Sequence, residues 1–480
     1  KTNQRPSGTC GLGMSAVVLI HGMLGWGEER PFYGLAPTYF PLQHLRRMWH
    51  EGLVVAVDVG IASSDHDCAC EAFAQLLGLR VDYGEVHSSS SDHVRFGTIF
   101  ETALLEQWDA TRPIHLVGHC FGCNTAIALC NLIAEDYWGI GTGPDWVLSV
   151  TCICPPLRGC SLPAALGLAL QEGQQHAPAG ALSSLTPLAT LCQLAFRAQK
   201  RWPSLLQPLF NTRMDRQQQQ GTCRDTIPSK HRVIRGQVDN LYKTYLIAVI
   251  AGSLEPLAPL AVMRKCAPFL CLAAASWISL LLVAWRARRR VHGEFQRLLA
   301  LRWIRQIALG LICWSLASPC LALLTLCEPR LKKHRAALGL RLQVAMEPMR
   351  PFLHKWLAHP LLRLSAWAFG SENDGLVGLM SQRGFDRLTL GRVVPLSCMP
   401  KTQVSSTANE DVAFQALERG RWHVIHVPGA DHCLGTWLDP YFTPHMYADL
   451  FGDWFICCST EPTELRLLPK PWKSSSSNSR

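Results

Sequence analysis

The residue with the clearest chemical potential is a cysteine set between two glycines. Gly118 and Gly122 flank Cys120 in the sequence Gly-His-Cys-Phe-Gly, which follows the apolar run 114–117. This order is typical of a nucleophile elbow, a strained turn that joins a strand to a helix and exposes a nucleophile. Glycine is needed on both sides because a Cβ would clash where strand and helix approach each other. We therefore predict that Cys120 is a nucleophile, in the position where most such enzymes carry serine.

The acid and the base that such a nucleophile needs follow it along the chain. Asp374 lies in the polar turn 372–375, and His432 lies in a loop after the apolar run 422–427. Enzymes with this elbow use the chain order nucleophile, acid, histidine. We expect His432 to take the proton of Cys120 while Asp374 orients the imidazole and stabilises its charged form.

Two backbone amides are expected to stabilise the oxyanion of an acyl-transfer reaction. The apolar run 16–20 ends at His21-Gly22, a turn that commonly supplies one N–H, and the residue after the nucleophile supplies the other. The predicted donors are Met23 and Phe121.

Several segments resemble the staphylococcal-type and thermoalkalophilic bacterial lipases. Residues 21–27 read H-G-M-L-G-W-G against the family's H-G-x-x-G-W-G, residues 67–76 resemble its D-R-A-C-E-A-Y-A-Q-L, and residues 373–377 resemble its N-D-G-I-V. The resemblance covers roughly residues 14–160 and 340–445. It implies an α/β-hydrolase fold, with a mostly parallel sheet and flanking helices. It also implies hydrolysis of lipid esters, such as triacylglycerols, with Cys120 in place of the nucleophilic serine.

The same resemblance implies a zinc site beside the active site. Asp67, His87 and His93 fall on the family's zinc positions, and one carboxylate with two imidazoles is a ligand set that zinc accepts. The family's fourth ligand is an aspartate in a region where the sequences do not align. Three candidates stay open: Asp215, Asp225 and Asp239.

The residues of the family's calcium site match less well than those of the zinc site. Leu434 takes the place of a glutamate ligand, although Asp439 and Pro440 match the family. Calcium is bound through oxygen atoms, so the loss of a carboxylate weakens such a site. We expect no tight calcium site here.

Composition fits a large hydrolase rather than a nucleic-acid-binding protein. The 480 residues are 48% hydrophobic with a net charge of +10, and we find no nucleic-acid motif. The charge favours acidic lipid surfaces. The 20 cysteines are irregularly spaced, which indicates buried thiols in a reducing compartment rather than a disulfide framework. Because the chain begins at Lys1, we expect a fragment or a processed form, and the lack of a signal peptide carries no information.

The chain is predicted to divide into five parts. They are a polar lead-in (1–13), the first part of the hydrolase core (14–160), a helical insertion (161–340), the second part of the core (341–460) and a disordered tail (461–480). Alternation of apolar runs and helical patterns predicts a parallel sheet. The expected strands are 16–20, 53–57, 114–117, 146–152, 393–398 and 422–427, with helices near 68–79 and 122–134.

The insertion contains two apolar segments without charges, 266–285 and 307–327, each long enough to cross a bilayer. A short basic loop, 286–290, follows the first. We expect a two-span membrane hairpin, which returns the chain to the side of Cys120. The alternative is a helical lid or a buried helix pair. Residues 245–263, with Glu255 and two prolines, make a poor third span.

Two classes of function remain open. The first is a lipid-ester hydrolase that acts through an acyl-enzyme, with an acyltransferase as the variant in which an alcohol replaces water. The second is a catalytically silent, membrane-associated lipid-binding relative that kept the fold. The lipid ester and a membrane surface or bilayer are the expected partners.

Overall fold

The computed structural model describes residues 15–30, 36–49, 52–61, 63–91, 93–160, 241–262, 264–265, 335–369, 372–383, 393–394, 419–455 and 458. The expected lead-in and tail lie outside the described residues, as do the three candidate aspartates for the fourth zinc ligand.

A seven-stranded sheet forms the centre of the described structure, and all its neighbouring strands are parallel. In spatial order the strands are β2 (Val54–Val57), β1 (Val17–Ile20), β5 (Ile114–His119), β6 (Val147–Ile153), β7 (Tyr245–Ala251), β9 (Trp422–Val427) and β8 (Val393–Val394). Strand β1 has β2 on one side and β5 on the other, so the strand order reverses at β1. Ligands of such sheets bind at the carboxyl ends of the strands, where the strand order reverses.

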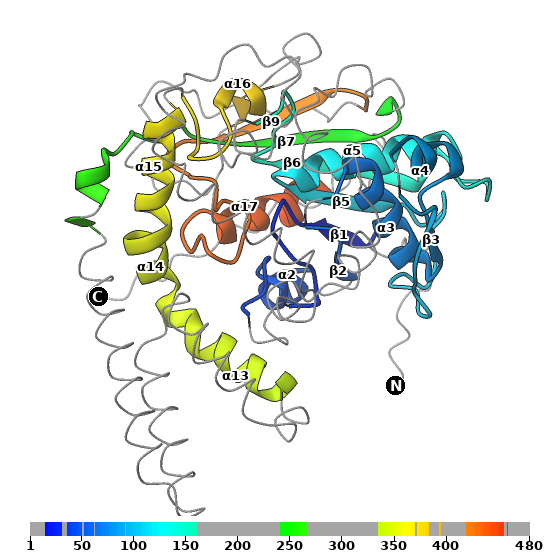
Figure 1. The fold of residues 1–480 in the computed structure, drawn as a ribbon, viewed down its shortest axis with the longest axis horizontal. Coiled ribbons are helices and arrows are strands. Elements are labelled where there is room, and N and C mark those ends of the chain that lie inside the picture. Colours follow the sequence, from blue (N-terminus) through cyan, green and yellow to red (C-terminus); the bar gives the residue numbers. More distant parts are fainter. Residues whose placement is uncertain are drawn as a thin grey trace, which may run out of the picture.

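Helices cover both faces of the sheet (Figure 1). Val18 and Ile20 of β1 pack with α3 (Asp65–Leu77) and α5 (Phe121–Ala134) on one face. Val17 and Leu19 pack with α2 (Leu42–Met48), α17 (Thr443–Asp449) and η7 (Leu450–Trp454) on the other. Strands covered on both faces are apolar along their whole length, because every side chain is buried.

The remaining elements extend this three-layer core. β3 (Arg80–Asp82) and β4 (Phe96–Ile99) form a two-stranded antiparallel sheet, and α4 (Glu85–Ser91) lies between them in the chain. The short helix η1 (Pro144–Trp146) precedes β6. The later helices are α13 (Arg335–Met346), η5 (Glu347–Met349), α14 (Arg350–Leu353), η6 (His354–Ala358), α15 (His359–Phe369) and α16 (Leu379–Gln382). Figure 1 shows α13, α14 and α15 following one another along one side of the molecule, away from α3, α4 and β3.

The sequence predicts most of these elements, and the clearest exception is β7. Residues 245–251 form a central strand, although the sequence analysis treats them as part of a poor third membrane span. All seven residues are buried. A fully buried parallel strand and an apolar helix give the same continuous apolar run, so periodicity alone does not separate them.

The lengths and composition of the described helices test the predicted membrane hairpin. No helix in the described ranges is both long and apolar enough to cross a membrane. Helix α5 has 14 residues, about 21 Å at 1.5 Å per residue, against about 30 Å of hydrocarbon. The helical run from α13 to α15 carries Arg341, Arg350, Lys355 and Arg363. This finding contradicts the two-span hairpin, whose segments, 266–285 and 307–327, lie outside the described residues.

The predicted fold class is confirmed. The sheet is parallel, helices cover both its faces, and β5 passes through a sharp turn at Cys120 directly into α5. The described core is that of an α/β-hydrolase.

Candidate active site

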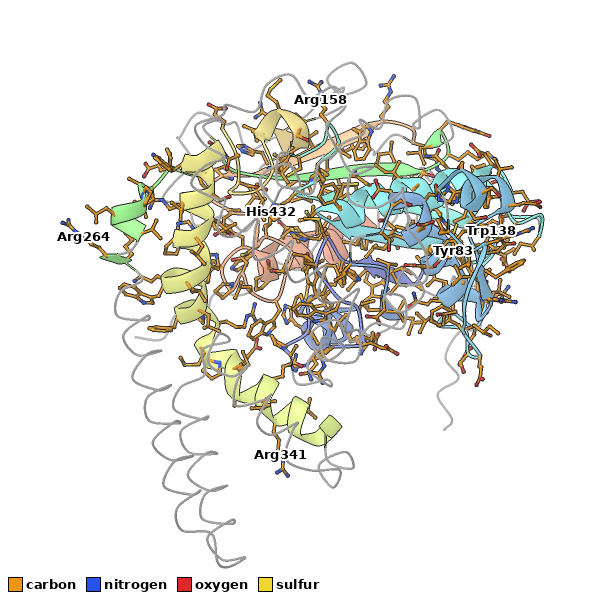
Figure 2. All side chains as sticks on the ribbon, viewed as in Figure 1. Tyr83, Trp138, Arg158, Arg264, Arg341 and His432 are labelled. Atoms are coloured by element: carbon orange, nitrogen blue, oxygen red, sulfur yellow. The ribbon has the colours of Figure 1, made fainter. Side chains whose placement is uncertain are left out.

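The topology gathers the predicted site residues at one edge of the sheet. His21 follows β1, Cys120 follows β5, and the loop with His432 follows β9. Because the strands are parallel, their carboxyl ends meet at this edge. In Figure 2, His432 lies between α15 and the strands, well away from Tyr83 and Trp138 on the side of α3.

Cys120 has the strained backbone of a nucleophile elbow. Its φ is 55° and its ψ is −126°, a conformation that residues with a side chain rarely adopt. A Cβ on Gly122 would lie 2.1 Å from the Ile20 carbonyl oxygen, and one on Gly118 would lie 2.5 Å from Cys123 Cα. The two glycines therefore allow α5 to pack directly on β1 and β5, as the motif requires.

His432 and Asp374 form a buried pair. The Nδ1 atom of His432 lies 2.8 Å from Oδ2 of Asp374, and Asp374 has no exposed surface. The pair joins two loops that are 58 residues apart in the chain. Since Nδ1 donates to the carboxylate, the basic atom of the neutral ring is Nε2.

Neighbouring groups favour the charged form of His432. Burial opposes charging, but Asp374 and Cys120 outweigh burial and hold the pKa of the imidazole well above its ordinary value. Cys120 acts on the imidazole through its charge and through a close contact, although the buried Nε2 has no well-aligned hydrogen bond among the described residues. Catalytic hydrogen bonds are often loose without substrate and tighten only when it binds.

Asp374 is fixed by donors that sequence reasoning did not find. Its Oδ1 accepts from the backbone amides of Leu376 at 3.0 Å and Val377 at 2.8 Å. Its Oδ2 accepts from Nε2 of Gln382 at 3.0 Å, while Ala251 of β7 donates to Oε1 of the same glutamine. The two amides directly follow the predicted polar turn and belong to the lipase-like segment 373–377, but no sequence pattern marks Gln382.

The turn after β1 lies against the nucleophile. A Cβ on Gly22 would be 2.7 Å from the Cβ of Cys120, so the backbone at Gly22 runs directly beside it. His21 holds this turn: its Nδ1 donates to the Gly22 carbonyl at 2.8 Å, and its Nε2 accepts from Val59 at 3.2 Å. Met23 packs in the same cluster as Cys120.

His119 links the two sides of the site. Its Nδ1 lies 2.6 Å from the hydroxyl of Tyr39, which also accepts from the Gly22 amide at 3.4 Å. Its Nε2 donates to the carbonyl of His432 at 3.0 Å. Burial and the nearby His432 hold the pKa of His119 well below its ordinary value, so the ring is neutral. His119 lies inside the elbow motif, but nothing in the sequence places Tyr39 beside it.

Apolar groups surround Cys120. Cys120 is buried in a cluster with Phe121, Cys160 and Val377, and Met23 and Leu376 pack against it. The thiol of Cys120 therefore lies against an apolar surface.

The three predicted metal ligands also come together, at a second place. Nε2 of His87 and Nε2 of His93 lie 3.0 Å and 3.5 Å from Oδ1 of Asp67, which the N-cap of α3 positions. One ligand atom from each residue lies within 4.8 Å of the others. Nδ1 of His93 donates to the Val94 carbonyl at 2.9 Å, and its Nε2 is buried with no hydrogen-bond partner among the described residues. One carboxylate oxygen and two imidazole nitrogens suit zinc.

The expected calcium position has a different environment. Leu434 is fully buried in the apolar core, and Asp439 accepts hydrogen bonds from the amides of Tyr441, Phe442 and Thr443. Asp439 therefore stabilises the turn before α17. The absence of a tight calcium site stays a prediction.

Comparison with known proteins shows which sequences this chain is similar to. Residues 14–137 match the family model for the lipase-like, C-terminal domain, a segment that runs from β1 through α5. The lipase of Staphylococcus hyicus is 37% identical over 162 residues, covering 30% of this chain and 25% of that protein. Lipase 2 of Staphylococcus aureus is 32% identical over 116 residues, covering 23% and 16%. Over this part of its length, the chain is similar to staphylococcal lipases.

The relationship covers only part of each protein. The chain matches about a quarter of the length of Staphylococcus hyicus lipase. The segment matched by the family model contains Cys120, Asp67, His87 and His93, but neither Asp374 nor His432. Among solved structures, Staphylococcus hyicus lipase has a TM-score of 0.47 at 16% identity, covering 95% of this chain and 97% of that one. Lipase 1 of Pelosinus fermentans has a TM-score of 0.46 at 16% identity, covering 92% and 98%.

Proposed function

We propose that this protein hydrolyses carboxylic esters of lipids through Cys120, His432 and Asp374. The observation that carries the proposal is the buried His432–Asp374 pair beside a cysteine with the backbone of a nucleophile elbow. The relationship to lipases supports ester hydrolysis as the class of reaction.

The reaction would proceed by acyl transfer. His432 Nε2 takes the proton of the Cys120 thiol as sulfur attacks the ester carbonyl carbon, and Asp374 stabilises the imidazolium. The amides of Met23 and Phe121 are the proposed donors to the oxyanion; Phe121 is the first residue of α5, where amides point out of the helix. The C–O bond breaks, and the leaving alcohol takes the proton from His432. Water then attacks the thioester, giving a proton to His432 and releasing the acid and the thiol.

The substrate class follows from the surroundings of Cys120. Met23, Leu376 and Val377 present apolar side chains around the thiol. Transfer of an acyl chain from water to such surroundings is favourable, because each buried CH₂ contributes about 0.8 kcal/mol to the binding free energy. A lipid ester therefore fits this site better than a polar one.

The first test is hydrolysis of short- and long-chain p-nitrophenyl esters by the native protein, Cys120→Ala and Cys120→Ser. We expect activity in the native protein and its loss in Cys120→Ala. The control is Cys123→Ala, which removes a buried thiol from the next turn of α5. An inert native protein with an active Cys120→Ser variant would instead indicate a silent relative whose pocket is shaped for serine. If an added alcohol captures the acyl group in preference to water, the protein is an acyltransferase.

We also propose that Asp67, His87 and His93 bind zinc. The buried Nε2 of His93, which has no hydrogen-bond partner among the described residues, and the shared Asp67 oxygen support this proposal. A bound zinc ion would supply structural cross-linking between α3 and the segment that carries α4.

The zinc proposal predicts a loss of both metal and stability on mutation. His93→Ala should reduce bound zinc by about one ion per chain and lower the thermal midpoint, because bound metal stabilises only the folded state. Metal analysis and calorimetry provide the measurements, with the exposed His445→Ala as the control. A His93→Ala protein that retains its zinc would contradict the ligand set.

A further inference from the structure

A second cluster of metal-binding side chains lies next to the candidate active site. His354, Asp431 and Cys433 each offer a ligand atom, and these atoms lie within 4.8 Å of one another. His354 and Asp431 line a cavity of about 190 Å³, together with His359 and Tyr441. None of these residues takes part in the proposed hydrolysis, and none belongs to the Asp67 cluster.

Local helix geometry brings two histidines to this place. Residues five apart in an α-helix are rotated by about 140° from each other, at 3.6 residues per turn. The segment His354–Ala358 is π-helical, and the amide of His359 donates to the carbonyl of His354. A hydrogen bond from residue i+5 to residue i stacks these positions one above the other. Both imidazoles therefore face Asp431. Such π-helical turns occur frequently at functional sites.

His354 and Asp431 form a close, buried contact. Nε2 of His354 lies 2.9 Å from Oδ2 of Asp431. That nitrogen is buried and has no hydrogen-bond partner among the described residues, and the side chain is 9% exposed. Together with the sulfur of Cys433, these two buried atoms lie close enough to one another to bind one ion. We infer that His354, Asp431 and Cys433 bind a transition-metal ion of the zinc class.

The ligand types select the metal. Calcium and magnesium are held by oxygen ligands, whereas imidazole and thiolate favour zinc and its neighbours in the transition series. Ligands of tetrahedral zinc, at bond lengths of 2.0–2.3 Å, lie about 3.3–3.8 Å apart, so only small adjustments of these side chains are needed. Three protein ligands leave one position open toward the cavity.

The outer contacts hold the carboxylate in place. His359 Nδ1 lies 2.8 Å from Oδ2 of Asp431, and the amide of Cys433 donates to Oδ1 at 2.9 Å. Metal ligands are usually oriented by such second contacts. The ring of Tyr441 packs edge-on against His354, with ring centroids 5.6 Å apart.

The proposed metal site shares a loop with His432. Asp431 and Cys433 immediately precede and follow His432 in the chain. An ion bound to them and to His354 joins the His432 loop to the helical run of α14 and α15. The inference concerns metal binding alone, and its test needs no turnover, so it stands or falls separately from the proposed hydrolysis.

Cobalt(II) is the appropriate probe, because a cobalt–thiolate bond absorbs in the near ultraviolet and a site without sulfur does not. The full chain carrying His93→Ala, which disables the Asp67 cluster, is titrated with Co²⁺. We expect one bound ion with thiolate absorption. Adding Cys433→Ser should abolish the absorption and weaken binding at least about 10-fold, whereas His359→Gln should weaken it about 10-fold and retain the absorption.

The control is Cys154→Ser, because Cys154 also has its sulfur within 4.8 Å of a carboxylate and an imidazole, those of Asp374 and His432. The absorption must persist in this variant. Thermal unfolding without metal verifies that each variant is folded. The inference is overturned if His93→Ala protein binds no Co²⁺, which would leave His354 and Asp431 as an ion pair only, or if the absorption survives in Cys433→Ser.

Discussion

Two histidines of the candidate site are each held in one tautomer by their partners. His119 accepts from Tyr39 at Nδ1 and donates from Nε2 to the carbonyl of His432. His432 donates from Nδ1 to Asp374, so its Nε2 is the atom that can take a proton. The proposed role of His432 Nε2 as the base therefore depends on the hydrogen bond from His432 Nδ1 to Asp374.

That dependence predicts the effect of Asp374→Asn. The amide leaves the volume unchanged but can present an N–H to the ring, which favours the wrong tautomer, and kcat for ester hydrolysis should fall on the order of 10³–10⁴-fold. The pKa of His432, which Asp374 raises against the effect of burial, should move to lower pH in the rate profile. Asp145→Asn, at an exposed ion pair with Lys243, is the control. An unchanged rate and profile would exclude Asp374 as the acid.

Residues fixed by a local motif could be predicted, and those fixed by tertiary structure could not. The elbow and the chain order identify Cys120, Asp374 and His432, which the structure brings together. Gln382 and Tyr39 contact these residues from loops whose approach depends on the whole fold. Similarly, only the π-helical turn at His354 shows that this residue faces Asp431.

At the scale of elements, the contact between α5 and β1 positions the nucleophile. The start of the helix lies so close to the strand that only glycine fits at position 122. The strand, the sharp turn and the helix form one unit, and any separation of α5 from β1 moves Cys120 away from the turn at Gly22.

Gly122→Ala should therefore destabilise the protein. The added methyl group would lie 2.1 Å from the Ile20 carbonyl oxygen, so the backbone must shift, at a cost of about 3 kcal/mol. Denaturant unfolding measures this cost. Gly143→Ala is the matched control, because a Cβ there meets nothing within 4 Å. Equal stabilities of the two variants would contradict the close contact between helix and strand.

The same scale explains why β7 escapes a sequence-based prediction. Its residues are buried on both sides, between β6 and β9, so no polar residue marks a face. By contrast, the start of α3 is marked by Ser64, whose hydroxyl accepts from the amide of Asp67 at 3.0 Å. Elements with a solvent-facing side or a cap carry local signals, and a central strand does not.

At the scale of the whole molecule, buried histidines make the fold sensitive to acid. His115 of β5 is completely buried and stacks on Phe455. Its Nδ1 lies 2.7 Å from the Ser149 hydroxyl, and its Nε2 has no hydrogen-bond partner among the described residues. Burial lowers its pKa to about 3. The folded protein holds this ring neutral, whereas the unfolded chain protonates it near pH 6.5.

This difference predicts how stability changes with pH. The contribution of His115 is fully present above about pH 6.5 and is lost as the pH falls toward 3, because the unfolded chain then binds the extra proton. Between pH 6.5 and pH 5 the loss is about 2 kcal/mol. Urea unfolding of His115→Gln should show a shallower pH dependence than the native protein, with the exposed His445→Gln as the control. Identical slopes in all three proteins would contradict the prediction.

The sequence similarity to lipases covers only part of the candidate site. The family match covers β1 to α5, while the proposed acid and base lie on later loops. Direct evidence for the site must therefore come from its own chemistry.

The most direct measurement is to trap the acyl-enzyme. The native protein is mixed with a p-nitrophenyl ester, quenched in acid within the first turnovers, and digested for mass spectrometry. We predict one acyl group on Cys120, still present in Cys154→Ala and greatly reduced in His432→Ala. An acyl group on another residue, or ester hydrolysis that continues in Cys120→Ala, would contradict the proposal that Cys120 is the nucleophile.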